Sequence, residues 1–102
     1  MIVKEEFLSK LRRNFSLNLY EVKIWTALLS RGVSTAGELS DIANVPRSRS
    51  YDVLESLQSK GFVSVKTTKP IKYVAIPPKD VLQNIKEKIE KDAESYLNKI
   101  KS

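Results

Sequence analysis

Apolar residues in the first third of the chain recur every three or four positions, which is the period of an amphipathic helix. Over residues 3–14 this spacing predicts a first helix with Phe7 and Leu11 on its apolar face. A second helix is predicted after Asn18, because Asn18 and Glu21 have the spacing of a capping residue and its reciprocal carboxylate.

Two shorter periodic segments follow, joined by a turn at residues 44–46. We expect Ser34 to cap the first of them, whose inner face would be Ala36, Leu39, Ile42 and Ala43. The second spans residues 47–60, just before Gly61, and its inner face would be Ser50, Val53, Leu54 and Leu57. Two such helices joined by a tight turn are typical of a helix-turn-helix, in which the second helix reads DNA.

The pattern then changes to short β-rich runs at residues 62–66 and 72–76, which predict an antiparallel hairpin. Two prolines at positions 77 and 78 break the chain, and a long polar helix is predicted over residues 79–101. The predicted fold is therefore mainly α with a small β-hairpin. It is a winged helix-turn-helix over residues 1–78, followed by a C-terminal helix over residues 79–102.

The long helix carries a narrow apolar seam whose members repeat with an eleven-residue period, which implies a straight or slightly right-handed pairing. The seam consists of Leu82, Ile85, Ile89, Ala93, Tyr96 and Ile100. A thin seam on a charged helix cannot bury itself alone, so we expect it to form a homodimer interface. The alternative is that the seam packs back on its own domain, against the first helix.

Composition narrows the chemistry that the chain can perform. The 102 residues contain no cysteine and no histidine, which removes disulfides, thiolate ligands, the commonest zinc ligand and the usual general base. Neither a paired carboxylate cluster nor a glycine-rich phosphate loop stands out. We therefore expect no enzyme activity, no metal and no cofactor.

The net charge is +6, and the excess lies on the predicted winged domain: residues 1–78 hold 12 basic and 7 acidic side chains, a net charge of +5. A basic small domain is typical of a partner that is an anion, most simply nucleic acid. No apolar run approaches the ~20 residues of a membrane span. We expect a cytoplasmic, nucleoid-associated protein that contacts no membrane.

The helix over residues 47–60 is the best candidate for contact with DNA. Arg47 and Arg49 lie in its first turn, where they can contact phosphates or reach guanine edges in the major groove. Ser48 and Asp52 lie on its exposed side, the first as a phosphate or base contact and the second as a partner of an arginine or a cytosine amine. The alternative is that the arginines form solvated ion pairs with Asp52 or Asp41.

Two further groups extend the predicted DNA surface. Lys66, Lys69 and Lys72 make the hairpin basic, which suits flanking phosphates or the minor groove. Ser34 and Thr35 begin the preceding helix, whose backbone N–H groups are expected to take one phosphate. Tyr51 is expected to pack beneath the hairpin. The alternative for the lysines is that they protect the hairpin edge from aggregation.

The order of elements and four segments resemble the N-terminal DNA-binding domain of the TrmB family of archaeal transcription regulators. The segments are LYEVKIWTALL at residues 19–29, STAGEL at 34–39, VPRSRSYDVLESL at 45–57 and KGFV at 60–63. The resemblance covers about residues 3–78. It implies a dimeric, sequence-specific DNA-binding protein whose recognition helix is the one at residues 47–60.

Members of this family that sense sugars carry a large C-terminal effector domain, whereas this sequence ends after the long helix. It is therefore either a fragment of a longer protein or a short form without the effector domain. We therefore expect no small-molecule effector to bind this chain alone. The predicted function is a sequence-specific regulator of transcription that binds double-stranded DNA as a homodimer, with its hairpin at residues 62–76 on the adjacent groove. Two alternatives remain: an architectural or chromatin protein without sequence preference, and a winged helix that binds proteins.

Overall fold

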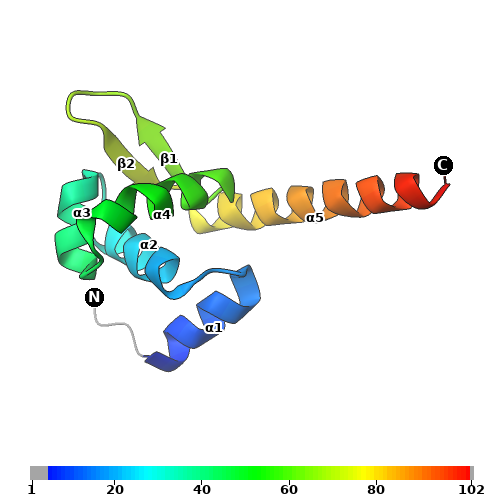
Figure 1. The fold of residues 1–102 in the computed structure, drawn as a ribbon, viewed down its shortest axis with the longest axis horizontal. Helices are drawn as coiled ribbons and strands as arrows, with labels where there is room; N and C mark the ends of the chain where they lie inside the picture. The colour runs from blue at the N-terminus through cyan, green and yellow to red at the C-terminus, as the bar shows by residue number, and fades with distance from the viewer. Residues whose placement is uncertain (1–4, 102) are drawn as a thin grey trace.

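The structure is a computed structural model that describes residues 5–101, except for the side chains at positions 7, 8, 10 and 11. The predicted apolar face of the first helix, including Phe7 and Leu11, lies outside the described residues. The elements are α1 (Glu5–Phe15), α2 (Leu19–Arg31), α3 (Ala36–Ala43), α4 (Arg47–Ser59), β1 (Val63–Lys66), β2 (Lys72–Ala75) and α5 (Pro78–Lys101). Figure 1 shows the hairpin above α3 and α4, α1 below them, and α5 projecting from one end.

The second helix begins where its capping residues predict. The side chain of Asn18 accepts a hydrogen bond from the N–H of Glu21 at 2.8 Å, and the Glu21 carboxylate accepts one from the N–H of Asn18 at 2.8 Å. Two backbone donors that the helix itself cannot pair are thereby satisfied.

The third helix is capped by Thr35, so the predicted cap at Ser34 is wrong by one residue. Thr35 and Glu38 form a capping box of the same kind as the one that opens α2. Ser34 instead pairs through its backbone with Tyr73 of β2, at 3.1 and 2.7 Å, and adds a one-residue bridge to the hairpin. Ile42, placed on the inner face by its spacing, is 47% exposed, because α3 is short and packs mainly through Ala36 and Leu39.

The two strands pair antiparallel, with Val63 opposite Ala75 and Lys66 opposite Lys72. The turn from α4 into β1 requires glycine at position 61, where φ is +86° and where an added Cβ would lie 2.9 Å from the side chain of Asn84. Strand β2 and the bridge to Ser34 then hold the hairpin on the start of α3.

The core lies between α2, α3, α4 and the first strand. Phe15, Trp25 and Phe62 meet edge to face at its α1 end, with ring centroids 5.1–6.4 Å apart. The fully buried side chains around them include Ile24, Leu28, Leu39, Leu54 and Leu57. The winged-helix prediction is confirmed, and the inner face predicted for α4 is buried throughout.

Among the described residues, the long helix is attached to this core by its first two turns. Val81 is buried, Ile85 packs against the core, and the Asn84 side chain donates a hydrogen bond to the carbonyl of Gly61 at 3.0 Å. Beyond this point α5 projects away from the other elements (Figure 1), and its apolar residues are open to solvent. These exposed residues are Ile89, Tyr96, Leu97 and Ile100.

Candidate nucleic-acid interface

The first turn of α4 has unpaired backbone donors among the described residues. Pro46 precedes the helix and provides no side-chain cap, while its carbonyl accepts hydrogen bonds from the N–H groups of Arg49 and Ser50 at 2.9 and 3.1 Å. The N–H groups of Arg47 and Ser48 have no acceptor in the described part of the chain. Such donors, together with the partial positive charge of a helix N-terminus, attract anions.

Arg47 and Arg49 lie on opposite flanks of the exposed face of α4. The Arg47 guanidinium lies against the first turn of α3, where a Cβ added at Gly37 would be 2.8 Å from its Nη2 atom. The Arg49 guanidinium lies over the ring of Tyr20 in α2, 5.7 Å from the ring centroid. Two different elements therefore hold the two guanidinium groups.

Neither arginine is in an ion pair with a described residue. Other cations of the domain are paired, Arg31 with Glu38 and Lys60 with Glu21. The alternative of solvated pairs with Asp41 or Asp52 therefore does not describe this structure, and both guanidinium groups keep N–H donors for another partner.

Between the two arginines, the exposed face of α4 carries small polar and acidic side chains. Ser48 and Asp52 are both exposed, as the sequence predicts. At 100° per residue, Glu55 and Ser59 continue the same face toward the end of the helix, and both are exposed as well. This face is therefore flanked by positive charge and acidic along its middle.

The start of α3 has fewer open backbone donors than predicted. Ser34 is fully buried, and its N–H donates to the carbonyl of Tyr73 at 3.1 Å, so this N–H is not open to a phosphate. Its hydroxyl donates to the carbonyl of Gly32 at 3.0 Å. The Thr35 hydroxyl accepts from the N–H of Glu38 at 3.2 Å, and Thr35 is partly exposed. The N–H of Thr35 itself is taken by the Glu38 carboxylate, at 2.9 Å.

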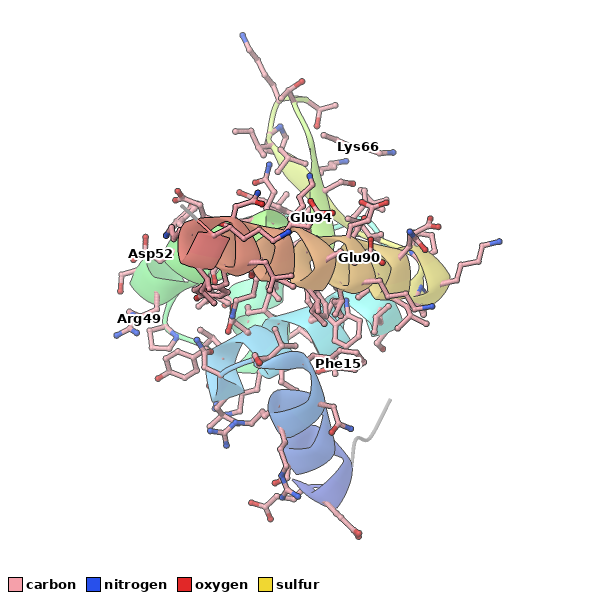
Figure 2. All side chains as sticks on the ribbon, turned by 90° about the vertical axis from the view of Figure 1, so that its right-hand side faces the viewer. Phe15, Arg49, Asp52, Lys66, Glu90 and Glu94 are labelled. Atoms are coloured by element: carbon pink, nitrogen blue, oxygen red, sulfur yellow. The ribbon has the colours of Figure 1, made fainter. Side chains whose placement is uncertain are left out.

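The hairpin exposes all three predicted lysines. Figure 2 shows Arg49 and Asp52 extending to one side of the view and Lys66 leaving the hairpin toward the other side. Lys66 and Lys72 face each other across the strand pair, and Lys69 is in the loop between the strands. The hairpin is thus a second basic surface, next to the exposed face of α4.

A groove between α4 and the hairpin exposes two apolar residues. Tyr51 lies beside the hairpin residues of this groove, where the sequence predicts it, and is 52% exposed. Ile71 in the hairpin loop was not predicted as part of this surface and is 51% exposed. Tyr73 lines the same groove, and its pKa is raised by burial and by the neighbouring Tyr51. Ile71 follows Pro70 in an otherwise polar loop. A single large apolar residue in such a loop was the sequence feature from which an exposed apolar contact could have been predicted.

A buried carboxylate fixes the position of α4 against α2. Glu21 is fully buried, accepts from the Ser56 hydroxyl at 2.7 Å and pairs with the Lys60 ammonium at 2.9 Å. Burial alone would raise the pKa of Glu21, but the hydrogen bonds from Asn18, Lys60 and Ser56 outweigh burial and hold it below its usual value of 4.5.

A second carboxylate orders the start of α3. The pKa of Glu38 is lowered by hydrogen bonds from the backbone and side chain of Thr35 and by the charge of Arg31. Both lowered values belong to carboxylates that cap helices, so they mark structural positions rather than a reaction centre.

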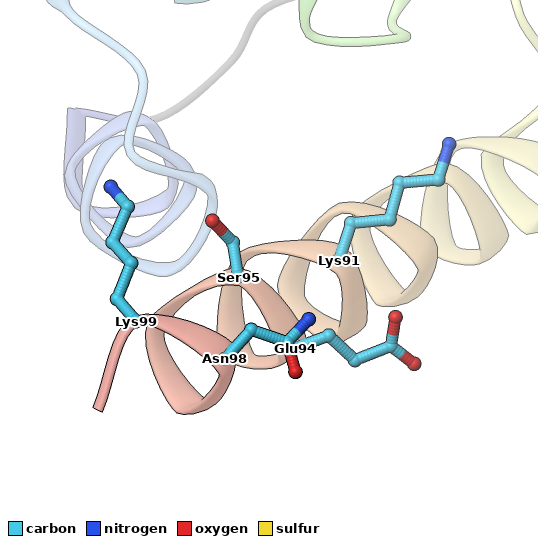
Figure 3. A pocket seen from close by; sticks show the side chains of 5 residues that line it. All are labelled: Lys91, Glu94, Ser95, Asn98 and Lys99. Carbon is cyan, nitrogen blue, oxygen red and sulfur yellow. The ribbon is translucent and has the colours of Figure 1, made fainter. Parts of the chain in front are cut away.

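The described residues contain no group of three or more acidic side chains placed to hold a metal ion, and none of their helices is long and apolar enough to cross a membrane. Figure 3 shows a shallow hollow on α5, lined by Lys91, Glu94, Ser95, Asn98 and Lys99. All five residues come from the polar side of one helix. The hollow is therefore a gap between neighbouring side chains rather than a site built by several elements.

Comparisons with known proteins agree with this geometry. The family model described as the sugar-specific transcriptional regulator TrmB matches residues 11–79. Over 82 residues the chain is 40% identical to the DNA-binding HTH-type transcriptional repressor TrmBL2 of Thermococcus kodakarensis, covering 80% of this chain and 31% of that protein. It is also 38% identical over 93 residues to the sugar-sensing regulator TrmBL1 of Pyrococcus furiosus, covering 91% and 27%.

A solved structure of TrmBL2, described as an archaeal chromatin protein with a novel mode of DNA binding, matches with a TM-score of 0.81 and 35% identity. The match covers 95% of this chain and 37% of that one. A MarR family protein from Bacillus stearothermophilus matches with a TM-score of 0.62 at 20% identity, over 96% of this chain and 69% of that one, and it supports the fold alone.

The chain spans about a third of the length of the TrmBL2 proteins that it matches. The relatives and the family model describe regulators, a non-enzymatic class, which confirms the prediction that this chain is not an enzyme. The matched segment contains all of the helix-turn-helix and the hairpin, so the resemblance drawn from the sequence is confirmed as well. This chain belongs to the TrmB family of transcriptional regulators and has its winged helix-turn-helix fold.

Proposed function

We propose that the chain binds double-stranded DNA with sequence preference and regulates transcription, with α4 in the major groove and the hairpin on the adjacent groove. The observation that carries this proposal is the first turn of α4. There, the N–H groups of Arg47 and Ser48 have no acceptor among the described residues, and neither Arg47 nor Arg49 is in an ion pair with a described residue. These donors suit the phosphates that border a major groove.

The acidic middle of the α4 face supports sequence preference. Asp52 and Glu55 would be repelled by phosphates, so a purely electrostatic DNA surface gains nothing from them. A carboxylate in the major groove can instead accept a hydrogen bond from a cytosine amine, and the Ser48 hydroxyl can bond to several base edges. A face of this composition discriminates between base pairs when it enters the groove.

The exposed seam of α5 supports a homodimer with a second copy of this chain as its partner. Ile89 is 62% exposed, Tyr96 67% and Ile100 79%, although they lie on one side of a helix about 36 Å long. Pairing two such seams removes from water an apolar surface that no described residue covers. A two-fold dimer of this kind would place its recognition helices one or more helical turns apart, at ~34–36 Å per turn.

A second candidate function is an architectural or chromatin role without sequence preference. It is favoured by the relative TrmBL2, whose structure is described as that of a chromatin protein. The same arginines and hairpin lysines would serve this role through phosphates alone. The ratio of specific to non-specific affinity separates the two candidates, because both depend strongly on salt.

The test is selection of bound duplexes from a random library by the purified chain at about 0.15 M salt. Enrichment of an inverted repeat is the expected result, and its spacing would give the distance between the two recognition helices. Binding without enrichment would favour the chromatin role. A failure to bind duplex DNA would overturn both and direct attention to the α5 seam as a protein-binding surface. The Arg47→Ala/Arg49→Ala double variant is the matched control, and it should lose most of its DNA binding.

A further inference from the structure

Tyr20 is a residue of α2, outside the helix-turn-helix, yet its ring lies directly beneath a side chain of the proposed DNA surface. The Arg49 guanidinium carbon is 5.7 Å from the centre of that ring, within the range of a cation–π contact. Tyr20 is partly buried and packs against the core, so the ring itself is held in place. Arg49 is exposed and makes no recorded ion pair.

The contact offsets an unfavourable charge. A cation in the first turn of a helix opposes the helix dipole, which is unfavourable. A cation–π contact at an exposed site is favourable and of similar size. The Tyr20 ring can therefore hold Arg49 in a position that the N-terminus of α4 alone would disfavour.

A cation–π contact uses the charge of the guanidinium and no hydrogen bond, so the N–H donors of Arg49 stay available to a ligand. The long arginine side chain would otherwise lose much of its rotamer entropy when a ligand fixes it. A guanidinium that is already held in place loses less on binding, which is the general benefit of preorganisation.

The direction of the Arg49 side chain also indicates which part of the DNA it would contact. Ser48 is central on the exposed face of α4, and at 100° per residue Arg49 lies about 100° around the helix from it. The Arg49 side chain extends further toward α2, where it meets Tyr20. A side chain on this flank is directed toward the rim of a groove occupied by α4, where the phosphates lie, rather than toward the base edges.

We propose that Tyr20 is a positioning residue that holds Arg49 for contact with one DNA phosphate, so that Arg49 contributes affinity without base preference. This inference rests on the proposed binding of duplex DNA. If it is correct, base discrimination by α4 falls to the side chains in the middle of its face, Ser48 and Asp52.

The test measures dissociation constants over a range of salt concentrations for the full chain and its variants, on two duplexes of unrelated sequence. Arg49→Ala should weaken binding to both duplexes by the same factor and reduce the salt slope by about one. Tyr20→Leu should weaken binding about two- to fivefold. Tyr20→Phe keeps the ring and should bind like the parent chain.

The combined variant Tyr20→Leu/Arg49→Ala separates positioning from a general effect on the fold. If Tyr20 acts through Arg49, the double variant should bind no more weakly than Arg49→Ala alone. An equal further loss in the double variant would overturn the positioning role, and circular dichroism of each variant shows whether the helices are intact. A change of preference between the two duplexes in Arg49→Ala would overturn the phosphate contact. Absence of duplex binding by the parent chain would instead reject the proposed function itself.

Discussion

Single residues decide how the two arginines of α4 are presented. Arg47 can lie against α3 because position 37 has no side chain, and Arg49 can lie on α2 because position 20 is aromatic. The sequence predicted both arginines as DNA contacts from their place in the helix. It could not predict their directions, since those depend on Gly37 and Tyr20, which belong to other helices.

Gly37→Ala should increase the stability of the fold and decrease its affinity for DNA. The new Cβ would meet only the far end of the flexible Arg47 side chain, which can move away. Replacing a helical glycine by alanine then stabilises the fold by about 0.4–1 kcal/mol, whereas the displaced guanidinium should weaken DNA binding.

Thermal denaturation and a DNA titration of Gly37→Ala measure the two effects. The control is Gly37→Ala introduced into Arg47→Ala, where the substitution should stabilise the fold and leave the remaining DNA affinity unchanged. A variant of the parent chain that gains stability and keeps full affinity would contradict a role for the observed position of Arg47.

At the scale of elements, caps and spacing predicted the helices well wherever the deciding contacts are local. The reciprocal bonds between Asn18 and Glu21 span three residues, and α2 begins as predicted. The cap of α3 was misplaced, because Ser34 pairs with Tyr73, which is far away in the chain. The part of Ile71 in the groove was missed for a similar reason, since it depends on the packing of the hairpin beside Tyr51 of α4.

The attachment of α4 to α2 should depend on pH through Glu21. Its pKa in the folded chain lies below the usual value of 4.5, so its stabilising contribution is present above that pH and is lost as the pH falls through the folded pKa. The free energy of unfolding should therefore decrease as the pH is lowered from about 4.5.

Glu21→Gln should reduce this pH dependence and destabilise the fold at neutral pH by about 1–2 kcal/mol, because Lys60 loses its charged partner in a partly buried position. Urea denaturation at several pH values measures both effects. The matched control is Glu55→Gln, on the exposed face of α4, which should leave the stability curve close to that of the parent. An equal pH dependence in Glu21→Gln and the parent would refute this assignment.

At the scale of the whole molecule, α5 contacts the winged domain through its first turns and then projects away from it. The chain measures 49 × 35 × 25 Å, and the outer part of α5 has no described neighbour from another element (Figure 1). The sequence predicted the apolar seam of α5 but not that most of the seam would lie away from the winged domain. The direction of α5 depends on the start of the helix, where Val81 is buried in the core.

Ile89→Asp should convert the proposed dimer into a folded monomer. A carboxylate in the middle of a paired seam would be buried without a partner, whereas in the monomer the position is 62% exposed and outside the core. Sedimentation velocity measures the mass, and circular dichroism confirms the helix content.

Lys91→Asp is the matched control for this experiment, because Lys91 lies on the opposite side of α5, in the hollow of Figure 3. This variant should remain dimeric. An Ile89→Asp chain that still sediments as a dimer would place the interface elsewhere in the molecule.

The hydrogen bond from Asn84 to Gly61 has a geometric consequence for the target DNA. It links the start of α5 to the connection between α4 and β1, so the recognition helix and the start of α5 are expected to move together as a rigid body. In a dimer paired along α5, a slip of the pairing by four residues would move the partner by about 6 Å, which is nearly two base pairs. The register of the α5 pairing would then set the distance between the two recognition helices. Substitutions in the α5 seam would change the spacing between operator half-sites without altering a residue that contacts DNA.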